Sequence, residues 1–190
     1  AIDLFGTKIG GNVQLAGSTF TGEVDATGSR IQGELHVSSD RLAPTWKDEA
    51  RLLLRNASAD AIQAQMAGWD MLESDKGMVP TDLSGFTYNR FGGVLVSSGG
   101  GMGDEPADRL IQWIEAQHDH GTHYDPQPYE QLAKVLRDTG AEEKAKAIRY
   151  AKFEHKSEHD SQMSEGESAW LEAQRLLVGY GVYPFRVLYW

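Results

Sequence analysis

Residues 4–36 read LFGTKIGGNVQ, LAGSTFTGEVD and ATGSRIQGELH when they are divided into blocks of eleven. The three blocks match in two glycine columns, one hydroxyl column and two apolar columns. The matching residues are Gly6, Gly17 and Gly28; Gly11, Gly22 and Gly33; Thr7, Ser18 and Ser29; Ile9, Phe20 and Ile31; Val13, Val24 and Leu35. A fixed short period of this kind is typical of repeat architectures, which define a scaffold rather than a chemistry.

Within a block, apolar residues and glycines recur at every second position, as Ile9, Gly11 and Val13 do. This period of two indicates β-strands. From Gly17 to Phe20 the step lengthens to three residues, so the chain must turn a corner to keep its apolar face inward. Glycine allows positive φ and Ser or Thr hydroxyls bond nearby backbone groups, so the Gly-Ser-Thr sequence suits such a corner.

The larger apolar residues of positions 4–37 are spaced alternately by five and six. This spacing predicts a square, pentapeptide-like β-solenoid built from 11-residue half-coils, with roughly two blocks per coil. The competing interpretation is an antiparallel meander, in which each block is one strand with its turn. Because Ala1 is already in register, the repeat is also compatible with further coils preceding it in a longer protein.

The composition narrows the functional classes. A chain of 190 residues allows one domain or two small ones. Its 18 basic and 28 acidic residues give a net charge of −10 without a Lys/Arg cluster, so we expect no nucleic-acid binding. The absence of cysteine excludes disulfides, thiolate metal sites and cysteine nucleophiles. No run of about 18 apolar residues is present, so we expect no span of a bilayer.

The repeat weakens and then gives way to a helical pattern. Residues 51–62 form a degraded copy in which Asn56 and Ala57 take the Gly-Ser/Thr place, and residues 83–88 look like one more strand and corner. The sequence SSGGGMGDE at 97–105 is typical of a linker. We therefore predict a β-solenoid with inserted loops over 1–96, a glycine-rich linker over 97–105 and a helical domain over 106–190, α+β overall.

After the linker, the apolar period changes from two to 3.6. Pro106 is well placed to open a first helix. The sequence YEQLAKVLRDTG followed by AEEKAKAIRYAKFE predicts an antiparallel helical hairpin over 129–154, similar to a single tetratricopeptide-type unit. Ser164 and Glu167 form a capping box before a fourth helix.

The chain ends in LLVGYGVYPFRVLYW, which is rich in aromatic side chains with polar tips. Such a segment suits a membrane interface or a partner surface, and the alternative is a tail that packs back on its own domain. We take the large aromatic residues as candidate partner-binding anchors. They are Trp113, Tyr129, Tyr180, Tyr183, Phe185 and Trp190.

Histidines supply the candidate metal ligands. His118, His120 and His123 lie in QHDHGTHYDP with two aspartates between or beside them, a set that could hold zinc, nickel or copper. The alternative is a polar loop whose histidines are favoured by a helix C-terminus. Residues 155–159, HKSEH, match the zinc-peptidase pattern H-x-x-E-H, but their charged surroundings favour a solvated helix end.

Three features together resemble a known family: the repeated L-x-G-[ST]-x-[IF]-x-G-x-[VL] units, QPYEQLA at 127–133 and GYGVYP at 179–184. They are similar to bacterial proteins of the pentapeptide-repeat-like "membrane-associated oxidoreductase" family, over most of the chain except residues 38–50 and 63–80. The resemblance implies redox activity and a tail that precedes hydrophobic membrane segments. No cysteine, dinucleotide fingerprint or flavin signature accompanies it here.

We therefore expect a non-enzymatic, membrane-proximal scaffold or protein-interaction module without a cofactor, for instance an accessory subunit of a larger membrane complex. Its expected contacts are a protein partner or a membrane interface through the C-terminal tail. Its expected location is the cytoplasmic face of a bacterial membrane or the cytoplasm. The alternative is a metal-dependent enzyme or sensor that uses His118, His120 and His123.

Overall fold

The computed structural model describes residues 1–39, 41–47, 49–72, 77–92, 101–116, 124–159 and 170. The chain divides into two compact units, Ala1–His118 and Asp119–Trp190. The strands and helices of the first unit are β1 (Ile2–Asp3), β2 (Lys8–Ile9), β3 (Val13–Gln14), β4 (Thr19–Phe20), β5 (Glu23–Asp25), β6 (Arg30–His36), β7 (Thr45–Trp46), β8 (Arg51–Leu53), β9 (Ser58–Gln63), the 3₁₀ helix η1 (Met66–Trp69), β10 (Thr81–Asp82), β11 (Thr87–Phe91), the 3₁₀ helix η3 (Met102–Asp104) and α1 (Ala107–Glu115). The second unit contains α2 (Gln127–Asp138) and α3 (Glu142–His159).

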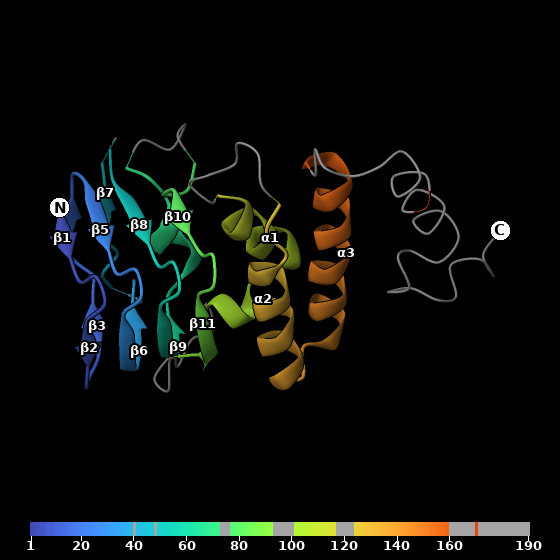
Figure 1. The fold of residues 1–190 in the computed structure, drawn as a ribbon, viewed down its shortest axis with the longest axis horizontal. Helices are drawn as coiled ribbons and strands as arrows, with labels where there is room; N and C mark the ends of the chain where they lie inside the picture. The colour runs from blue at the N-terminus through green and yellow to red at the C-terminus, as the bar shows by residue number, and fades with distance from the viewer. Residues whose placement is uncertain are drawn as a thin grey trace. The chain divides into compact units, whose positions relative to one another are not determined.

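The strands of the first unit pair in parallel in three separate sheets (Figure 1). One sheet has the order β1-β5-β8-β10, a second has the order β2-β6-β9-β11 with β3 also paired to β6, and β4 pairs with β7. Ile2 of β1 lies opposite Val24 of β5, which is the equivalent position two eleven-residue blocks later. Paired strands are therefore distant in sequence, and the chain passes through the other sheets before it returns to pair with an earlier strand.

The predicted fold class, a β-solenoid followed by helices and α+β overall, is wrong. The structure is mixed α/β, with mostly parallel sheets and, among the described residues, three α-helices. Its strands belong to several separate sheets rather than to a closed solenoid. The meander is also wrong, because every strand pair in the described part of the chain is parallel. The spacing of apolar residues indicates which side chains point inward, but it does not determine whether neighbouring sides share backbone hydrogen bonds.

Tight turns separate the sheets at the predicted corners. The corner residues Gly6, Gly17, Gly28, Asn56 and Gly85 all have positive φ, between 54° and 77°. At each corner the residue after this position donates its N–H to the carbonyl three residues before it, as Thr7 does to Leu4 over 3.1 Å. This geometry is that of a type II β-turn, which requires positive φ at its third residue. The corners predicted at Asn56 and Gly85 are thus confirmed.

Aspartates add a second bond to three corners. The carboxylates of Asp3, Asp25 and Asp82 each accept the backbone N–H of the residue two positions later, at 2.8–3.0 Å. These Asx turns orient the chain as it enters the β-turn. Asp82 is also nearly buried, and its Oδ2 accepts a 2.8 Å hydrogen bond from Nε of Arg55. The repeat columns had not singled out this aspartate position.

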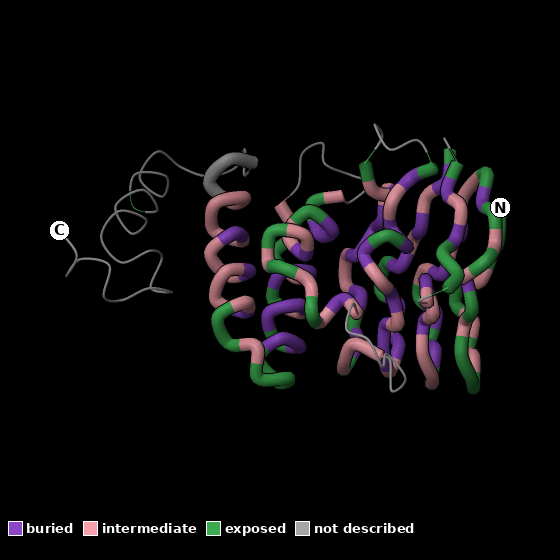
Figure 2. Tube along the Cα trace, turned by 180° about the vertical axis from the view of Figure 1, so that it is seen from behind, coloured by how far each residue is buried: buried purple, intermediate pink, exposed green. Residues whose placement is uncertain are grey.

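The core of the first unit contains most of the residues predicted to face inward (Figure 2). Those that are buried include Leu15, Phe20, Val24, Ile31, Leu35 and Val37. Phe20 stacks on Trp46 of the neighbouring strand β7, with ring centroids 4.6 Å apart. Helix α1 extends this core, because Trp113 lies 5.2 Å from Trp69 and 6.5 Å from Tyr88 between ring centroids. The sequence-based division had placed α1 in the helical domain, whereas its tryptophan packs within the first unit.

The second unit contains the predicted hairpin, in which α2 and α3 pack together through a short connection at Gly140, whose φ is +84°. The apolar residues of α2 that face this packing are buried, as are Ala145 and Ile148 of α3. Its likeness to a tetratricopeptide unit stays a prediction. Among the helices in the described ranges, none has the length and apolar character needed to cross a membrane.

Replacing Asp82 by alanine tests the importance of the aspartates at the corners. The variant loses both the Arg55 pair and the N–H bond from Ser84, which lies 3.0 Å from Oδ1. We expect the free energy of unfolding to fall by about 1–3 kcal/mol, because the buried carboxylate of Asp82 accepts hydrogen bonds from two donors that would both lose it. Urea unfolding of the purified chain measures this change.

The matched control is Asp3→Ala, which removes the same type of N–H bond at an exposed corner. We expect its cost to be smaller than that of Asp82→Ala, because water replaces the lost acceptor. Equal costs for the two variants would contradict the role assigned to Asp82 and its pair with Arg55.

Candidate functional site

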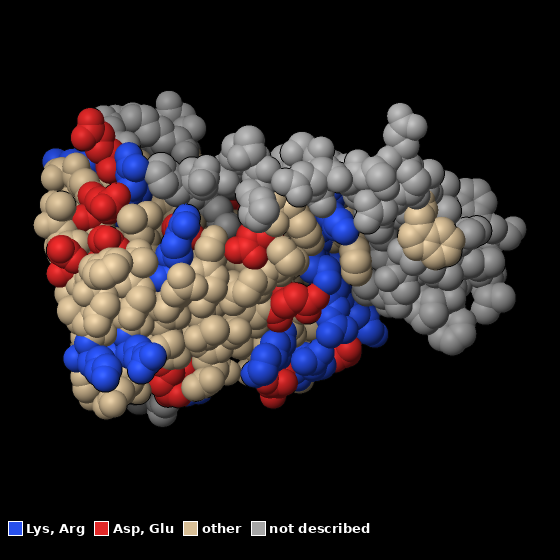
Figure 3. All heavy atoms as spheres, in the orientation of Figure 1, with Lys and Arg blue, Asp and Glu red and all other residues tan. Residues whose placement is uncertain are grey.

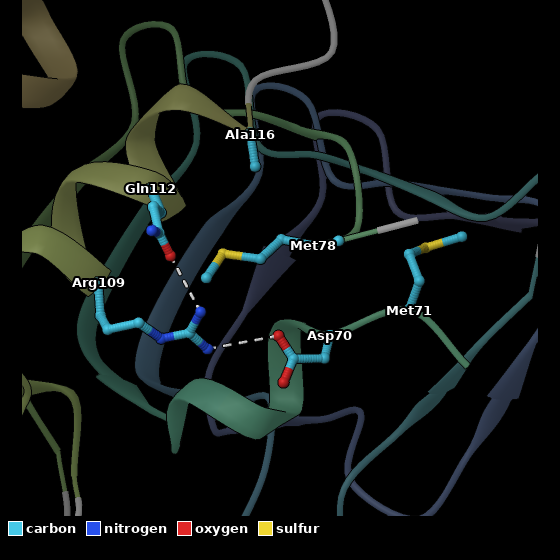
Figure 4. A pocket seen from close by; sticks show the side chains of 7 residues that line it. Asp70, Met71, Met78, Arg109, Gln112 and Ala116 are labelled. Carbon is cyan, nitrogen blue, oxygen red and sulfur yellow. Dashed lines mark hydrogen bonds and ion pairs between the residues drawn. The ribbon is translucent and has the colours of Figure 1, made fainter. Parts of the chain in front are cut away.

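A pocket of about 430 Å³ lies in the first unit, between the segment after η1 and the helix α1 (Figure 4). Its described lining consists of Asp70, Met71, Gly77, Met78, Arg109, Gln112 and Ala116. This volume falls in the range of pockets that accept small molecules or a large side chain of a partner, roughly 300–1,000 Å³.

Backbone pairing fixes both walls of the pocket. Asp70 forms an antiparallel bridge with Met78, and Val79 donates its N–H to the carbonyl of Trp69 over 2.6 Å. The opposite wall, α1, is tied at its end, where the N–H of Thr81 donates to the carbonyl of Ala116 over 3.0 Å. The pocket is therefore supported by hydrogen-bonded backbone and by the buried tryptophan pair behind it.

Two methionines belong to the pocket lining. The half-buried side chain of Met78 extends toward Arg109 and Gln112, whereas that of Met71, which is 7% exposed, extends away from them (Figure 4). Methionine is unbranched and polarizable, so it adapts its shape to different apolar groups. Met78 is therefore suited to contact apolar groups of different shapes.

A guanidinium group spans the mouth of the pocket. Nη1 of Arg109 donates to Oε1 of Gln112 over 3.0 Å, and Nη2 lies 3.6 Å from Oδ1 of Asp70. The second distance is longer than a hydrogen bond. The side chains of Arg109 and Asp70 are 40% and 45% exposed, and a pair of that kind contributes about 0–1 kcal/mol. The Arg109 side chain can thus change partners at little cost.

The described lining of the pocket contains few ionisable groups. Among the described lining residues there is one carboxylate and one guanidinium, and no nucleophile paired with a base. The described part of the chain also holds no group of three or more acidic, histidine or cysteine side chains placed to bind a metal ion.

A second polar cluster lies on the outer face of the five-stranded sheet. Glu34 of β6 and Arg90 of β11 both lie in register with Ala61 of β9, and their side chains meet above it, with Nη2 of Arg90 3.1 Å from Oε1 of Glu34. Ala61 is fully buried beneath them. The other oxygen of Glu34, Oε2, lies 2.7 Å from Nε2 of His36. A larger residue than alanine at position 61 would keep the pair apart.

The pKa shifts in this cluster fit a structural role. Hydrogen bonds from Asn89 and Arg90 lower the pKa of the Asp60 carboxyl below its ordinary value, against a smaller opposing effect of burial. Burial lowers the pKa of Arg90, but its hydrogen bonds with Asp60 and Glu34 outweigh this and raise the pKa. Both groups therefore remain charged near neutral pH, and the cluster holds β6, β9 and β11 together.

Two of the predicted partner-binding anchors are buried in the structure. The Trp113 and Tyr129 side chains are each 2% exposed, so in this conformation neither can serve as a surface anchor. Both rings are buried for the same reason, because each lies on the inward face of an amphipathic helix. The other four anchors, Tyr180, Tyr183, Phe185 and Trp190, lie outside the described residues.

The candidate metal ligands His118, His120 and His123 also lie outside the described residues, so this site stays a prediction. His155, from the H-x-x-E-H match, is half-buried in the second unit, and its ring lies 5.9 Å from the ring of Tyr129 and 6.2 Å from that of Tyr124. Aromatic packing of this kind supports a structural role.

No pattern in the sequence marks the pocket. Residues 70–78 and 109–116 are separated by some thirty positions and share no motif. The only local signal is the pair Met71 and Met78 in a segment without a clear period.

Comparison with known proteins does not identify a relative, since no family model, no curated protein and no solved structure matches this chain. The resemblance to the pentapeptide-repeat-like family thus stays a prediction.

Metal analysis by mass spectrometry, on the purified chain and on a triple His118, His120, His123→Ala variant, decides the predicted metal site. For a scaffold we expect far less than one transition-metal ion per chain and the same unfolding curve for both proteins. Near-stoichiometric metal that disappears in the variant would instead support the metal-dependent alternative, since imidazole ligands hold such ions.

Proposed function

We propose that this chain is a non-enzymatic scaffold or protein-interaction module, and that the pocket lined by Asp70, Met78 and Arg109 receives an apolar side chain of a protein partner. The observation that supports this proposal is the combination of an apolar side chain, Met78, with the exposed guanidinium of Arg109 in one pocket. Arginine is enriched among the residues that contribute most to binding at protein interfaces, and methionine is common on surfaces that accept varied partners.

The rigidity of the surroundings supports the same role. The pocket walls are joined by backbone hydrogen bonds, and Trp69 and Trp113 pack behind them. A site held in its binding conformation loses little conformational entropy when a partner docks. The parallel sheets then serve as the platform that carries this site.

The proposal also includes a membrane-proximal position, which rests on the aromatic composition of residues 176–190 alone. Aromatic side chains with polar tips favour the interface between lipid and water.

Site-specific photo-crosslinking in living cells tests the pocket. A photoreactive amino acid at position 112, which is exposed and lines the pocket, is expected to give one discrete adduct with a protein. The same amino acid at position 108, which is exposed on α1 but does not line the pocket, is the matched control. Met78→Glu in the position-112 protein should abolish the adduct, because a buried carboxylate would face the partner's apolar group.

Identical adducts from positions 112 and 108, or an adduct that persists with Met78→Glu, would refute the docking role of the pocket. The membrane-proximal part is tested separately by deleting residues 176–190 and fractionating the same cells. We expect the deletion to release the chain from the membrane fraction, and an unchanged distribution would refute that part of the proposal.

A further inference from the structure

We infer that the pocket recognises the carboxyl terminus of a partner polypeptide that ends in an apolar residue. Arg109 would bind the terminal carboxylate, while Met78 would contact the terminal side chain. This inference rests on the proposed docking role and adds the chemistry of the group that docks.

The arrangement around Arg109 already resembles carboxylate recognition. Each terminal nitrogen of its guanidinium faces one oxygen, Oε1 of Gln112 at 3.0 Å and Oδ1 of Asp70 at 3.6 Å. These oxygens come from two different residues, so neither nitrogen takes part in the parallel pair of hydrogen bonds that a single carboxylate offers to arginine. A carboxylate from a partner could supply both oxygens with that geometry.

Arg109 is better suited than Asp70 to bind the ligand's charge. A guanidinium is weakly hydrated and loses little on contact with apolar groups, whereas a carboxylate is costly to desolvate. The Arg109 side chain is long and extends from α1 across the mouth of the pocket (Figure 4). Asp70 is short, and its backbone is fixed by the bridge to Met78. In the free protein Asp70 therefore acts as a weak, displaceable partner of Arg109.

A cation is the competing ligand, since the net charge of −10 attracts cations at long range. Lys and Arg side chains are nevertheless interspersed with Asp and Glu on the face of the first unit shown in Figure 3. The Arg109–Asp70 pair at the pocket should therefore determine whether an anion or a cation is bound. The two possibilities predict opposite effects of neutralising Asp70.

The requirement for a chain terminus follows from the size of the pocket. The arginine and the methionines line one cavity of about 430 Å³, so a ligand must present its anion and its apolar group close together. The terminal residue of a polypeptide carries both on one Cα atom. An internal Asp or Glu carries its carboxylate at the end of its own side chain, and the nearest apolar side chain belongs to a different residue.

Methionine methyl NMR of the full chain tests the inference. The chain has five methionines, of which Met71 and Met78 line the pocket, while the buried Met66 and Met102 report on the integrity of the fold. The probes are the peptide acetyl-Gly-Ser-Gly-Leu as the free acid, the same peptide as its carboxyl-terminal amide, acetyl-Gly-Ser-Gly-Lys amide as the cation, and 4-methylpentanoate as a small acid without a peptide.

We expect the free-acid peptide to shift the Met71 and Met78 signals saturably and to bind more tightly than the other three probes. Arg109→Gln should weaken its binding by about tenfold or more, as expected for loss of a charge-assisted hydrogen bond. Asp70→Asn should strengthen its binding, because a like charge is removed. Arg137→Gln, at an exposed arginine of α2, is the matched control and should change nothing.

Other results would overturn the inference in distinguishable ways. Tighter binding of the lysine peptide than of the acid, weakened by Asp70→Asn, would show that the pocket selects a cation. Equal binding of the acid and the amide would leave the docking role intact but would refute recognition of the carboxylate. Equal binding of 4-methylpentanoate would assign the site to small acids instead of a polypeptide. If no probe shifts Met71 or Met78 while Met66 and Met102 keep their folded positions, the docking role fails as well.

Discussion

The turn at each corner is the constraint on which the first unit depends. A residue with positive φ, four times glycine and once Asn56, closes a hydrogen bond across three residues and redirects the chain. Equivalent turns are hydrogen-bonded to one another, as the N–H of Gly6 is to the carbonyl of Thr27, so the strands beside them pair in parallel and in register. The turns directly follow β1, β3, β5, β8 and β10, and in each case the next strand belongs to another sheet.

The pocket exists because this order is interrupted. Between β9 and β10 the chain leaves the repeat, forms η1 and pairs with itself around Asp70 and Met78. Helix α1 then covers the resulting surface, with Trp113 against Trp69. Regular repeats present similar surfaces at every level, whereas an irregular insertion covered by a helix creates a concave surface. The candidate site therefore lies where the repeat is absent.

The two polar groupings of the first unit differ in how strongly they are held. Arg90 forms hydrogen-bonded ion pairs with both Glu34 and Asp60. The small side chain of the buried Ala61 leaves room for the Glu34–Arg90 pair above it. Asp70 and Arg109 are about as exposed as Asp60 and Arg90, but they stand farther apart, at 3.6 Å, beside a pocket. Tightly paired charges stabilise strands but have little capacity for a ligand, while a loosely paired arginine beside apolar groups keeps that capacity.

The sequence by itself determined the local features: the strand period, the corners at Gly17, Gly28 and Asn56, and the helical hairpin of the second unit. These features depend on the φ preferences of single residues and on periodicity within a few turns, both of which can be read from neighbouring positions. Only the tertiary structure decided that the sheets stay separate, that Trp113 and Tyr129 are buried, and that Arg109 meets Asp70 beside two methionines. Each of these depends on hydrogen bonds or side-chain packing between elements, and for the sheets and the pocket these elements lie about twenty to forty residues apart in the chain.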